Sequence, residues 1–194
     1  MNLSLLDREQ LEAVLLDPPA IEPQPLLCSD HAVVAFLPSP TTPRSTRIRH
    51  VLAAAHELLV RIASQAIVGR PLLNSPSLAK DFLKVMFAGA ERESFVVVFV
   101  DNSTRVIAVE ELFIGTVTQT AVYPREVVRR ALHHNATGVL CAHPHPSGIA
   151  EPSRADEHLT QQLKAALATV DVKLLDHLVV SGASCVSFAE RGLL

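Results

Sequence analysis

Residues 95–100 (FVVVFV) are apolar at every position, and this run constrains the fold of the chain more than any other feature of its sequence. A strand without a polar face has no side for solvent, so it must lie in a sheet that is covered on both faces. Other segments rich in apolar residues, at 137–142, 174–181 and 185–188, predict further strands, and segments with helical spacing separate several of them. This alternation predicts an α/β fold, with a mixed β-sheet flanked by helices.

Residues 92–194 make up this α/β region, which we expect to contain two more strands and two helices. The additional strands are predicted at 105–109 and 113–121. Pro124 suits the first turn of one helix, and a second helix is predicted from about 153 to 170. The predicted inner faces are Val127, Val128, Ala131 and Leu132 in the first helix, and Leu159, Leu163, Leu167 and Val170 in the second.

A proline-rich segment begins the chain. Residues 1–43 contain seven of the 13 prolines, and they predict an N-terminal extension with few regular elements. We expect a short helix at 7–16 and a strand at 31–37 within it. The sequence leaves open whether this extension is loosely packed or docks a partner.

Residues 44–91 predict a helical segment that leads into the core, because apolar residues recur there at helical spacing. Its second helix is predicted to begin near Pro76, which suits a first helical position. The predicted buried side of that helix comprises Leu78, Phe82, Val85 and Met86.

Composition limits the classes of function. The chain has 194 residues, of which 48% are hydrophobic, which suits one ordinary domain with a buried core. A formal net charge of −3 excludes binding of nucleic acid by overall charge, although the arginines at 44–70 leave open a local patch or a solvated helix face. No apolar run approaches the ~20 residues of a membrane helix.

The three cysteines, Cys28, Cys141 and Cys185, are an odd number and lie far apart in the sequence. They predict neither a disulfide framework nor a CxxC pair, and Cys141 is expected in the core. The first residues lack a basic segment followed by an apolar one, as a secretory leader would have. These features together predict a cytoplasmic protein.

The segment 142–156 (AHPHPSGIAEPSRAD) carries the strongest chemical signal. His143 and His145 lie two residues apart, so both imidazoles point to the same side of an extended backbone. Pro144 and Pro146 favour that backbone, because proline fixes its own φ and biases the preceding residue. Two imidazoles fixed side by side at a strand end favour a divalent metal site.

Asp156 is the candidate third ligand. Ser153 suits the N-cap of the following helix, and Asp156 lies three residues later, as in a capping box. Asp156 also precedes Leu159 by three residues, which places its carboxylate on the buried face of the first helical turn. An unpaired carboxylate is costly there, so the position favours a cation partner in addition to a helix cap.

The spacing His143-x-His145-Pro146, with Asp156 ten residues after the proline, resembles the JAMM motif of JAB/MPN metalloproteases. Over about residues 50–194 the wider sequence resembles the bacterial RadC branch of that family. Pro144 departs from the branch, which usually has Asn there, and residues 1–70 contain no GxG hairpin of the helix-hairpin-helix DNA-binding module of longer relatives. The matching segments are 92–95 (RESF), 115–116 (GT), 123–127 (YPREV), 145–148 (HPSG), 152–153 (PS), 175–177 (LDH) and 187–193 (SFAERGL).

The resemblance implies a JAB/MPN domain of the cytidine-deaminase-like fold. It also implies that His143, His145 and Asp156 bind Zn²⁺, with a water in the fourth position. The implied activity is that of a zinc metallopeptidase, which hydrolyses an amide or isopeptide bond in a peptide or protein substrate.

The family also uses a glutamate as general base, just before an apolar strand and upstream of the histidines. Glu93 matches best, because it directly precedes the apolar run, and Glu110 and Glu111 remain alternatives. Ser153 resembles the family serine whose hydroxyl stabilises the oxyanion, a role compatible with helix capping.

A second hypothesis is a non-catalytic RadC-like binding module linked to DNA repair or mobile-element proteins, and a homodimer remains open. Other HxH hydrolases are excluded, because about fifty residues after the motif cannot complete a barrel of ~250 residues. A nucleobase deaminase would need a PCxxC element, which the chain lacks. His133, His134 and His158 are predicted to lie outside the site, whereas the pair at 176–177 predicts either a buried hydrogen-bonded pair or support for the ligands.

Overall fold

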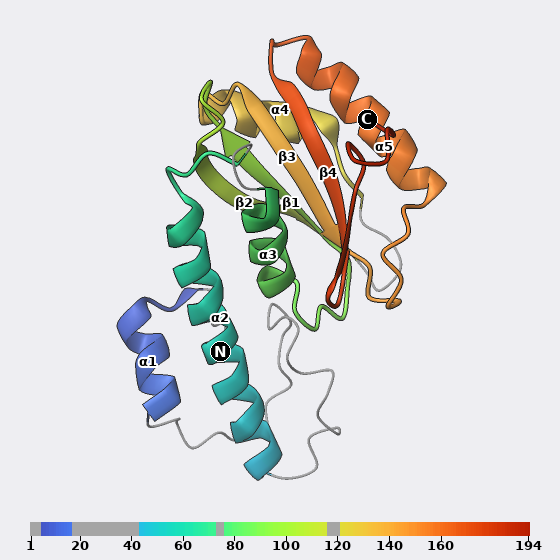
Figure 1. Ribbon diagram of the computed structural model, residues 1–194. Helices are drawn as coiled ribbons and strands as arrows, with labels where there is room; N and C mark the ends of the chain where they lie inside the picture. Colours follow the sequence, from blue (N-terminus) through green and yellow to red (C-terminus); the bar gives the residue numbers. More distant parts are fainter. Residues whose placement is uncertain (1–4, 17–42, 73–75, 116–120) are drawn as a thin grey trace.

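Residues 5–16, 43–72, 76–115 and 121–194 are described by the computed structural model, in which one mixed sheet is the central element (Figure 1). Within these residues the strand order is β2-β1-β3-β4-β5, and β3 and β4 are parallel whereas the other neighbours are antiparallel. The predicted α/β fold with a mixed sheet is therefore confirmed. The strands are β1 (Ser94–Val100), β2 (Val106–Ile114), β3 (Gly138–Pro144), β4 (Lys173–Ser181) and β5 (Ser184–Ser187).

Helices cover both faces of this sheet, as the apolar run in β1 requires. β1 is buried at all seven positions, and its alternate side chains enter two separate hydrophobic clusters. Helices α4 (Pro124–His133) and α5 (Arg154–Ala168) cover one face, which we call the site face. Helix α3 (Pro76–Met86) and the end of α2 (Pro43–Ile67) cover the other, which we call the apolar face.

Helix α1 (Arg8–Leu16) packs against α2 at a distance from the sheet (Figure 1). Leu11 and Val14 are buried there against Ala53 and Ala54, so the helix predicted at 7–16 is confirmed. The strand predicted at 31–37 lies outside the described residues, as does Cys28. No helix in the described part of the chain combines the length and apolarity needed to cross a membrane.

Three details of the predicted elements are wrong. Val85 is 37% exposed, because the buried side of α3 runs through Ala79, Phe82 and Leu83. Leu132 is 52% exposed, because a narrower stripe of α4 faces the sheet than its sequence predicts.

The third error concerns β2, which continues through 110–112, where the sequence predicts a break between two strands. Glu110 fits into this edge strand because Arg130 of α4 neutralises its carboxylate. The second strand is predicted at 113–121, and its residues 116–120 lie outside the described residues.

A β-bulge in β4 decides which of its side chains reach the site face. Val139 pairs with Leu174, whereas the next residue of β3, Leu140, pairs with Asp176, so β4 contains one extra residue at this point. Leu174 and His177 therefore both lie on the site face although they are three residues apart. Leu178 returns to the apolar face.

Candidate metal centre

His143 and His145 lie at the end of β3, where the strand passes into the loop before α5. His143 is buried, and its ring stacks on Phe95 of β1 with centroids 6.4 Å apart. The His145 backbone is held by β4, because its N–H donates to the Val180 carbonyl at 2.8 Å and its carbonyl accepts from the Ser181 hydroxyl at 2.8 Å. Both imidazoles are therefore fixed on the same side of the sheet, as the spacing predicts.

Asp156 lies in the first turn of α5, in the capping box that the sequence predicts. The Ser153 backbone N–H donates to Asp156 Oδ2 at 2.7 Å, and the Asp156 N–H donates back to the Ser153 hydroxyl oxygen at 3.2 Å. The side chain of Asp156 is only 16% exposed. The capping box thus orients the carboxylate toward the end of β3.

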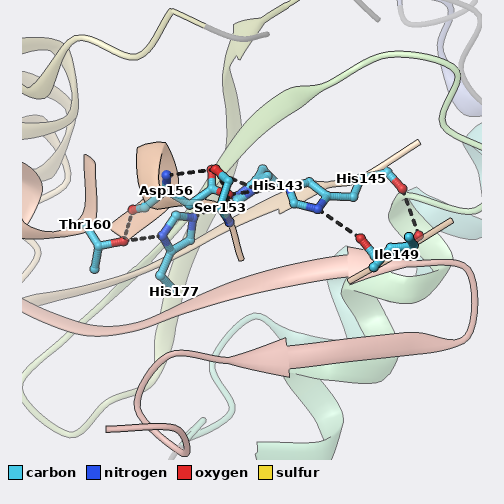
Figure 2. A network of polar contacts seen from close by, with 8 residues as sticks. His143, His145, Ile149, Ser153, Asp156, Thr160 and His177 are labelled. Carbon is cyan, nitrogen blue, oxygen red and sulfur yellow. Dashed lines mark hydrogen bonds and ion pairs between the residues drawn. The ribbon is translucent and has the colours of Figure 1, made fainter. Parts of the chain in front are cut away.

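The three predicted ligands meet in one cluster (Figure 2). The two Nε2 atoms of His143 and His145 are 3.0 Å apart. Asp156 Oδ1 lies 3.2 Å from Nε2 of His143, and Oδ2 lies 3.5 Å from Nε2 of His145. Side chains from two elements, ten or more residues apart in sequence, are therefore brought together as predicted.

These donor atoms fit a zinc ion. Tetrahedral zinc with bonds of about 2.0–2.2 Å has ligand atoms about 3.3–3.6 Å apart, close to the three distances observed. His145 Nδ1 donates to the Ile149 carbonyl at 3.0 Å, which leaves the lone pair of Nε2 facing the cluster. Two imidazole nitrogens and a carboxylate that converge in this way form a donor set that zinc accepts.

The pKa values of the cluster reflect the attraction between its charges. Burial alone would raise the pKa of Asp156, but hydrogen bonds with His143 and His145 lower it well below its usual range. The pKa of His145 is raised, chiefly by its hydrogen bond with Asp156. The carboxylate is thus ionised at neutral pH and available to a cation.

Glu93 lies next to this cluster, just before β1. The β1–β3 pairing ends at Val96 and Ala142, three residues after Glu93 and three residues before His145. The charge of Glu93 is accordingly one of the influences that raise the pKa of His145. The backbone of Glu93 is anchored, because its carbonyl accepts from the Gly115 N–H at 2.8 Å.

Glu110, the first alternative base, has other partners at the far end of the site face. Its carboxylate is hydrogen-bonded to Arg130 and to His134, whose Nε2 lies 2.8 Å from Oε1. These contacts, the Arg130 hydrogen bond first, lower the pKa of Glu110. Glu111 is its neighbour in β2, and neither of the two belongs to the cluster of potential ligands.

Ser153 occupies the N-cap of α5, and its hydroxyl donates to Asp156 Oδ2 at 2.6 Å. The capping role that the sequence predicts is confirmed. The hydroxyl lies against a potential metal ligand, which places it beside the cluster. Its role toward an oxyanion stays a prediction.

His133, His134 and His158 lie outside the cluster of potential ligands, as the sequence predicts. His133 and His158 are exposed, whereas His134 is part of the Glu110 cluster. Cys141 is buried in β3, and burial raises the pKa of its thiol. His177 is fully buried, and its Nε2 lies 2.9 Å from Nδ1 of His143.

The two residues at 176–177 have separate roles. Asp176 accepts hydrogen bonds from the Ser187 hydroxyl at 2.5 Å and the Ala189 N–H at 3.0 Å, so it holds the C-terminal segment. His177 contacts His143 instead, because the bulge turns it to the site face. Alternation along β4 from Leu174 would have selected the wrong residue of the two.

Sequence reasoning missed Thr160, which is fully buried on α5 and lies 2.7 Å from Nδ1 of His177. Its hydroxyl donates to the Asp156 carbonyl at 2.6 Å (Figure 2). The available signal was its position, four residues after Asp156 and three before Leu163, which places it on the inner stripe of α5.

Fold and site together define an α/β domain with a His-x-His and aspartate cluster at the edge of a mixed sheet. The sequence model of the family described as "RadC-like JAB domain" matches residues 73–193. The chain belongs to this RadC-like JAB domain family.

Named relatives agree with this assignment. The UPF0758 protein of Methylibium petroleiphilum is 55% identical over 146 residues, which are 75% of this chain and 66% of that protein. The UPF0758 protein of Leptothrix cholodnii is 53% identical over the same shares of the two chains, and that of Acidovorax sp. is 53% identical over 75% of this chain and 61% of its own. The matching part of the chain therefore spans slightly less than two thirds of the length of these relatives.

Proposed function

We propose that this chain is a zinc-dependent metallopeptidase that hydrolyses an amide or isopeptide bond. The observation that carries the proposal is the convergence of the two Nε2 atoms and the Asp156 carboxylate within zinc-ligand spacing. A structural helix cap would require Asp156 and Ser153, but it would not require two imidazoles directed at the same carboxylate.

His143, His145 and Asp156 would hold the ion, and Asp156 would contribute the one negative charge of the ligand set. A bound zinc ion would supply Lewis acidity, which acidifies a water and polarises a substrate carbonyl. The protein residues then have to orient the substrate and to handle the proton of the water.

Glu93 is the proposed general base. It directly precedes β1, and its charge acts on the imidazole of His145. In this role its carboxylate takes a proton from the attacking water and later gives that proton to the leaving amine. Glu110 is less suited, because Arg130 and His134 already engage its carboxylate.

Ser153 is the proposed donor to the developing oxyanion. Its hydroxyl donates to Asp156 in the capping box, and a cation on that carboxylate would compete for the same oxygen. The Ser153 hydroxyl could then turn toward the substrate carbonyl oxygen while its backbone N–H keeps the cap. The substrate class supported by this arrangement is a peptide or protein.

Zinc binding and peptide hydrolysis by the full chain test the proposal together. The metal-free protein should bind one zinc ion, measured by competition with a chromogenic chelator, and the loaded protein should cleave members of a fluorogenic peptide and isopeptide library. His145→Ala should lose both properties, whereas His133→Ala, which changes an exposed histidine, should keep both.

The opposite results would overturn the proposal. Equal zinc binding by wild type and His145→Ala would remove the proposed site. Stoichiometric zinc binding without cleavage of any library member, or no zinc binding at all, would favour the non-catalytic RadC-like binding module.

A further inference from the structure

His177 lies at the centre of a chain of buried polar contacts behind the candidate ligands (Figure 2). Its Nδ1 is 2.7 Å from the Thr160 hydroxyl, and its Nε2 is 2.9 Å from Nδ1 of His143. The Thr160 hydroxyl is in turn 2.6 Å from the Asp156 carbonyl. The chain therefore starts at the backbone of one candidate ligand and ends at the ring of another.

The hydrogens in this chain can be assigned by counting donors. A carbonyl oxygen only accepts, so the single hydrogen of the Thr160 hydroxyl is donated to Asp156. The contact between Thr160 and His177 then needs a hydrogen on Nδ1 of the histidine. A neutral imidazole has one N–H, so Nε2 of His177 is an acceptor.

The same count extends to His143. Because Nε2 of His177 accepts, the hydrogen in the 2.9 Å contact belongs to Nδ1 of His143. The lone pair of His143 is consequently on Nε2, which faces His145 and Asp156. This is the tautomer in which His143 can bind a metal through Nε2.

We infer that Thr160 and His177 are a positioning pair that fixes the tautomer and ring orientation of His143 for metal binding. The inference rests on the proposed metal site, and it assigns to two residues of α5 and β4 a role in preparing that site. Neither residue contacts the metal position; both act through His143.

An imidazole suits this position better than the carboxylate that often supports a histidine ligand. His177 is buried among Phe95, Phe188 and His143, with ring centroids 5.5, 4.9 and 4.9 Å away. A second buried carboxylate there would add an uncompensated negative charge, whereas neutral His177 accepts the hydrogen bond without one. The pair thus orients His143 while Asp156 remains the charged ligand.

The competing interpretation is structural. Threonine hydroxyls in helices often donate to the carbonyl four residues earlier, and a buried histidine needs partners whatever its function. Thr169, the C-cap of α5, provides a comparison, because its hydroxyl donates to the Ala166 carbonyl three residues earlier at 2.6 Å, at an exposed position outside the cluster. A positioning role therefore has to be separated from back-bonding by measurements on both threonines.

The first measurement is the tautomer of His177 in the metal-free full chain, read from long-range ¹H–¹⁵N correlations. We expect the hydrogen on Nδ1 in the wild type and in Thr160→Ser, which retains the hydroxyl. In Thr160→Val the Nδ1 acceptor is lost, and we expect a substantial population with the hydrogen on Nε2. A hydrogen on Nε2 of His177 in the wild type would overturn the inference without any variant.

The second measurement is the zinc dissociation constant of the same proteins, obtained by chelator competition. Thr160→Val should weaken binding roughly 10- to 100-fold, the range for groups that support a ligand. Thr160→Ser and Thr169→Val should stay near the wild type. Unchanged affinity in Thr160→Val, or an equal loss in Thr169→Val, would overturn the inference.

The two proposals can fail separately. If the wild type binds no zinc, the proposed function fails, while the tautomer of metal-free His177 still decides whether the pair imposes the orientation. If Thr160→Val does not fold, the wild type and Thr160→Ser decide, because the inference requires the same Nδ1 hydrogen in both. Thermal unfolding of each variant identifies that case.

Discussion

The two faces of the sheet share the same strands but bury different kinds of side chain. On the apolar face, Val96, Val98 and Leu140 meet α3 in a cluster that is hydrophobic throughout. On the site face, the buried set includes His143, Thr160 and His177, and their polar atoms bond to one another.

The difference separates stability from chemistry. Buried polar groups are costly unless each has a hydrogen-bond partner, so the polar side chains of the site face bond to one another. The side chains of the hydrophobic cluster on the apolar face need only to pack closely. Changes on the site face should therefore alter metal binding and activity most, and changes on the apolar face should alter the free energy of unfolding most.

Asp156→Asn should weaken metal binding at the site face more than any other change. Asparagine keeps the size of the side chain and can accept in the capping box, but it removes the charge shared by His143 and His145. Zinc affinity should fall by more than the ~100-fold upper end for supporting residues, measured by chelator competition. Asp81→Asn, at an exposed position of α3, should have no such effect; equal losses in the two variants would contradict the comparison.

Glu93→Gln should remove hydrolysis and keep the metal. The glutamine amide cannot accept the proton of the attacking water, so the rate of peptide cleavage should fall roughly 10²- to 10⁴-fold. Zinc stoichiometry should stay at the wild-type value, measured on the same samples. Glu110→Gln serves as the control, because that carboxylate is bound to Arg130. A comparable rate loss in the control would transfer the role to the other glutamate.

Leu83→Ala should destabilise the fold through the apolar face without changing metal binding. Leu83 is fully buried on the inner side of α3, and its truncation should lower the free energy of unfolding by about 2–5 kcal/mol, measured by urea denaturation. The fraction that remains folded should bind zinc as the wild type does. Weaker zinc binding by fully folded Leu83→Ala protein would show that the faces are coupled.

Ser153→Ala should have a smaller effect on stability, because one N-cap hydrogen bond is lost. We expect about 1 kcal/mol less stability, read from thermal unfolding of the metal-free protein. Ser153→Thr retains the hydroxyl and should therefore retain most of the stability that alanine loses. If alanine and threonine behave alike, the side chain does not cap α5 in solution.

The smallest expected effect concerns Glu110 and its dependence on pH. The Arg130 hydrogen bond lowers the pKa of Glu110, so the ionised carboxylate stabilises the folded state. That stabilisation is complete above the pKa of the unfolded chain and is lost as the pH falls through the lower folded value. At neutral pH the free energy of unfolding of the wild type should exceed that of Glu110→Gln by roughly 0.5–1 kcal/mol.

Urea denaturation across a pH series measures this difference. The two proteins should converge in acid, below the lowered pKa of Glu110. A difference that persists unchanged there would contradict the assignment of the stabilisation to this ion pair. Because Glu110 lies at the far end of the site face, zinc affinity should not follow the same pH series through this residue.

Local patterns were sufficient to predict most of the fold. The apolar run of β1, the capping box at Ser153 and Pro124 at the start of α4 are each decided by neighbouring residues, and the structure agrees with them. The convergence of His143 and Asp156 also followed from local rules, because strand alternation and helical spacing each fix the direction of one side chain.

The features that could not be predicted depend on contacts between distant segments. β2 continues through Glu110, whose carboxylate meets Arg130 twenty residues later in the chain. His177 reaches the site face only because β4 has an extra residue opposite β3, and no pattern within 173–181 marks that position. Thr160 acquires its role from His177, so it could not be selected before the bulge was known.

The extra residue of β4 links the direction of its side chains to the length of the strand. A one-residue deletion between Leu174 and His177 would leave a strand of similar hydrophobicity, able to pair with β3 along its whole length. It would remove the bulge and leave Leu174 and His177 two residues apart, so both would stay on the site face and His177 would remain opposite Cys141. The shorter strand would instead lose Leu175 or Asp176, and Asp176 is the residue that holds the C-terminal segment.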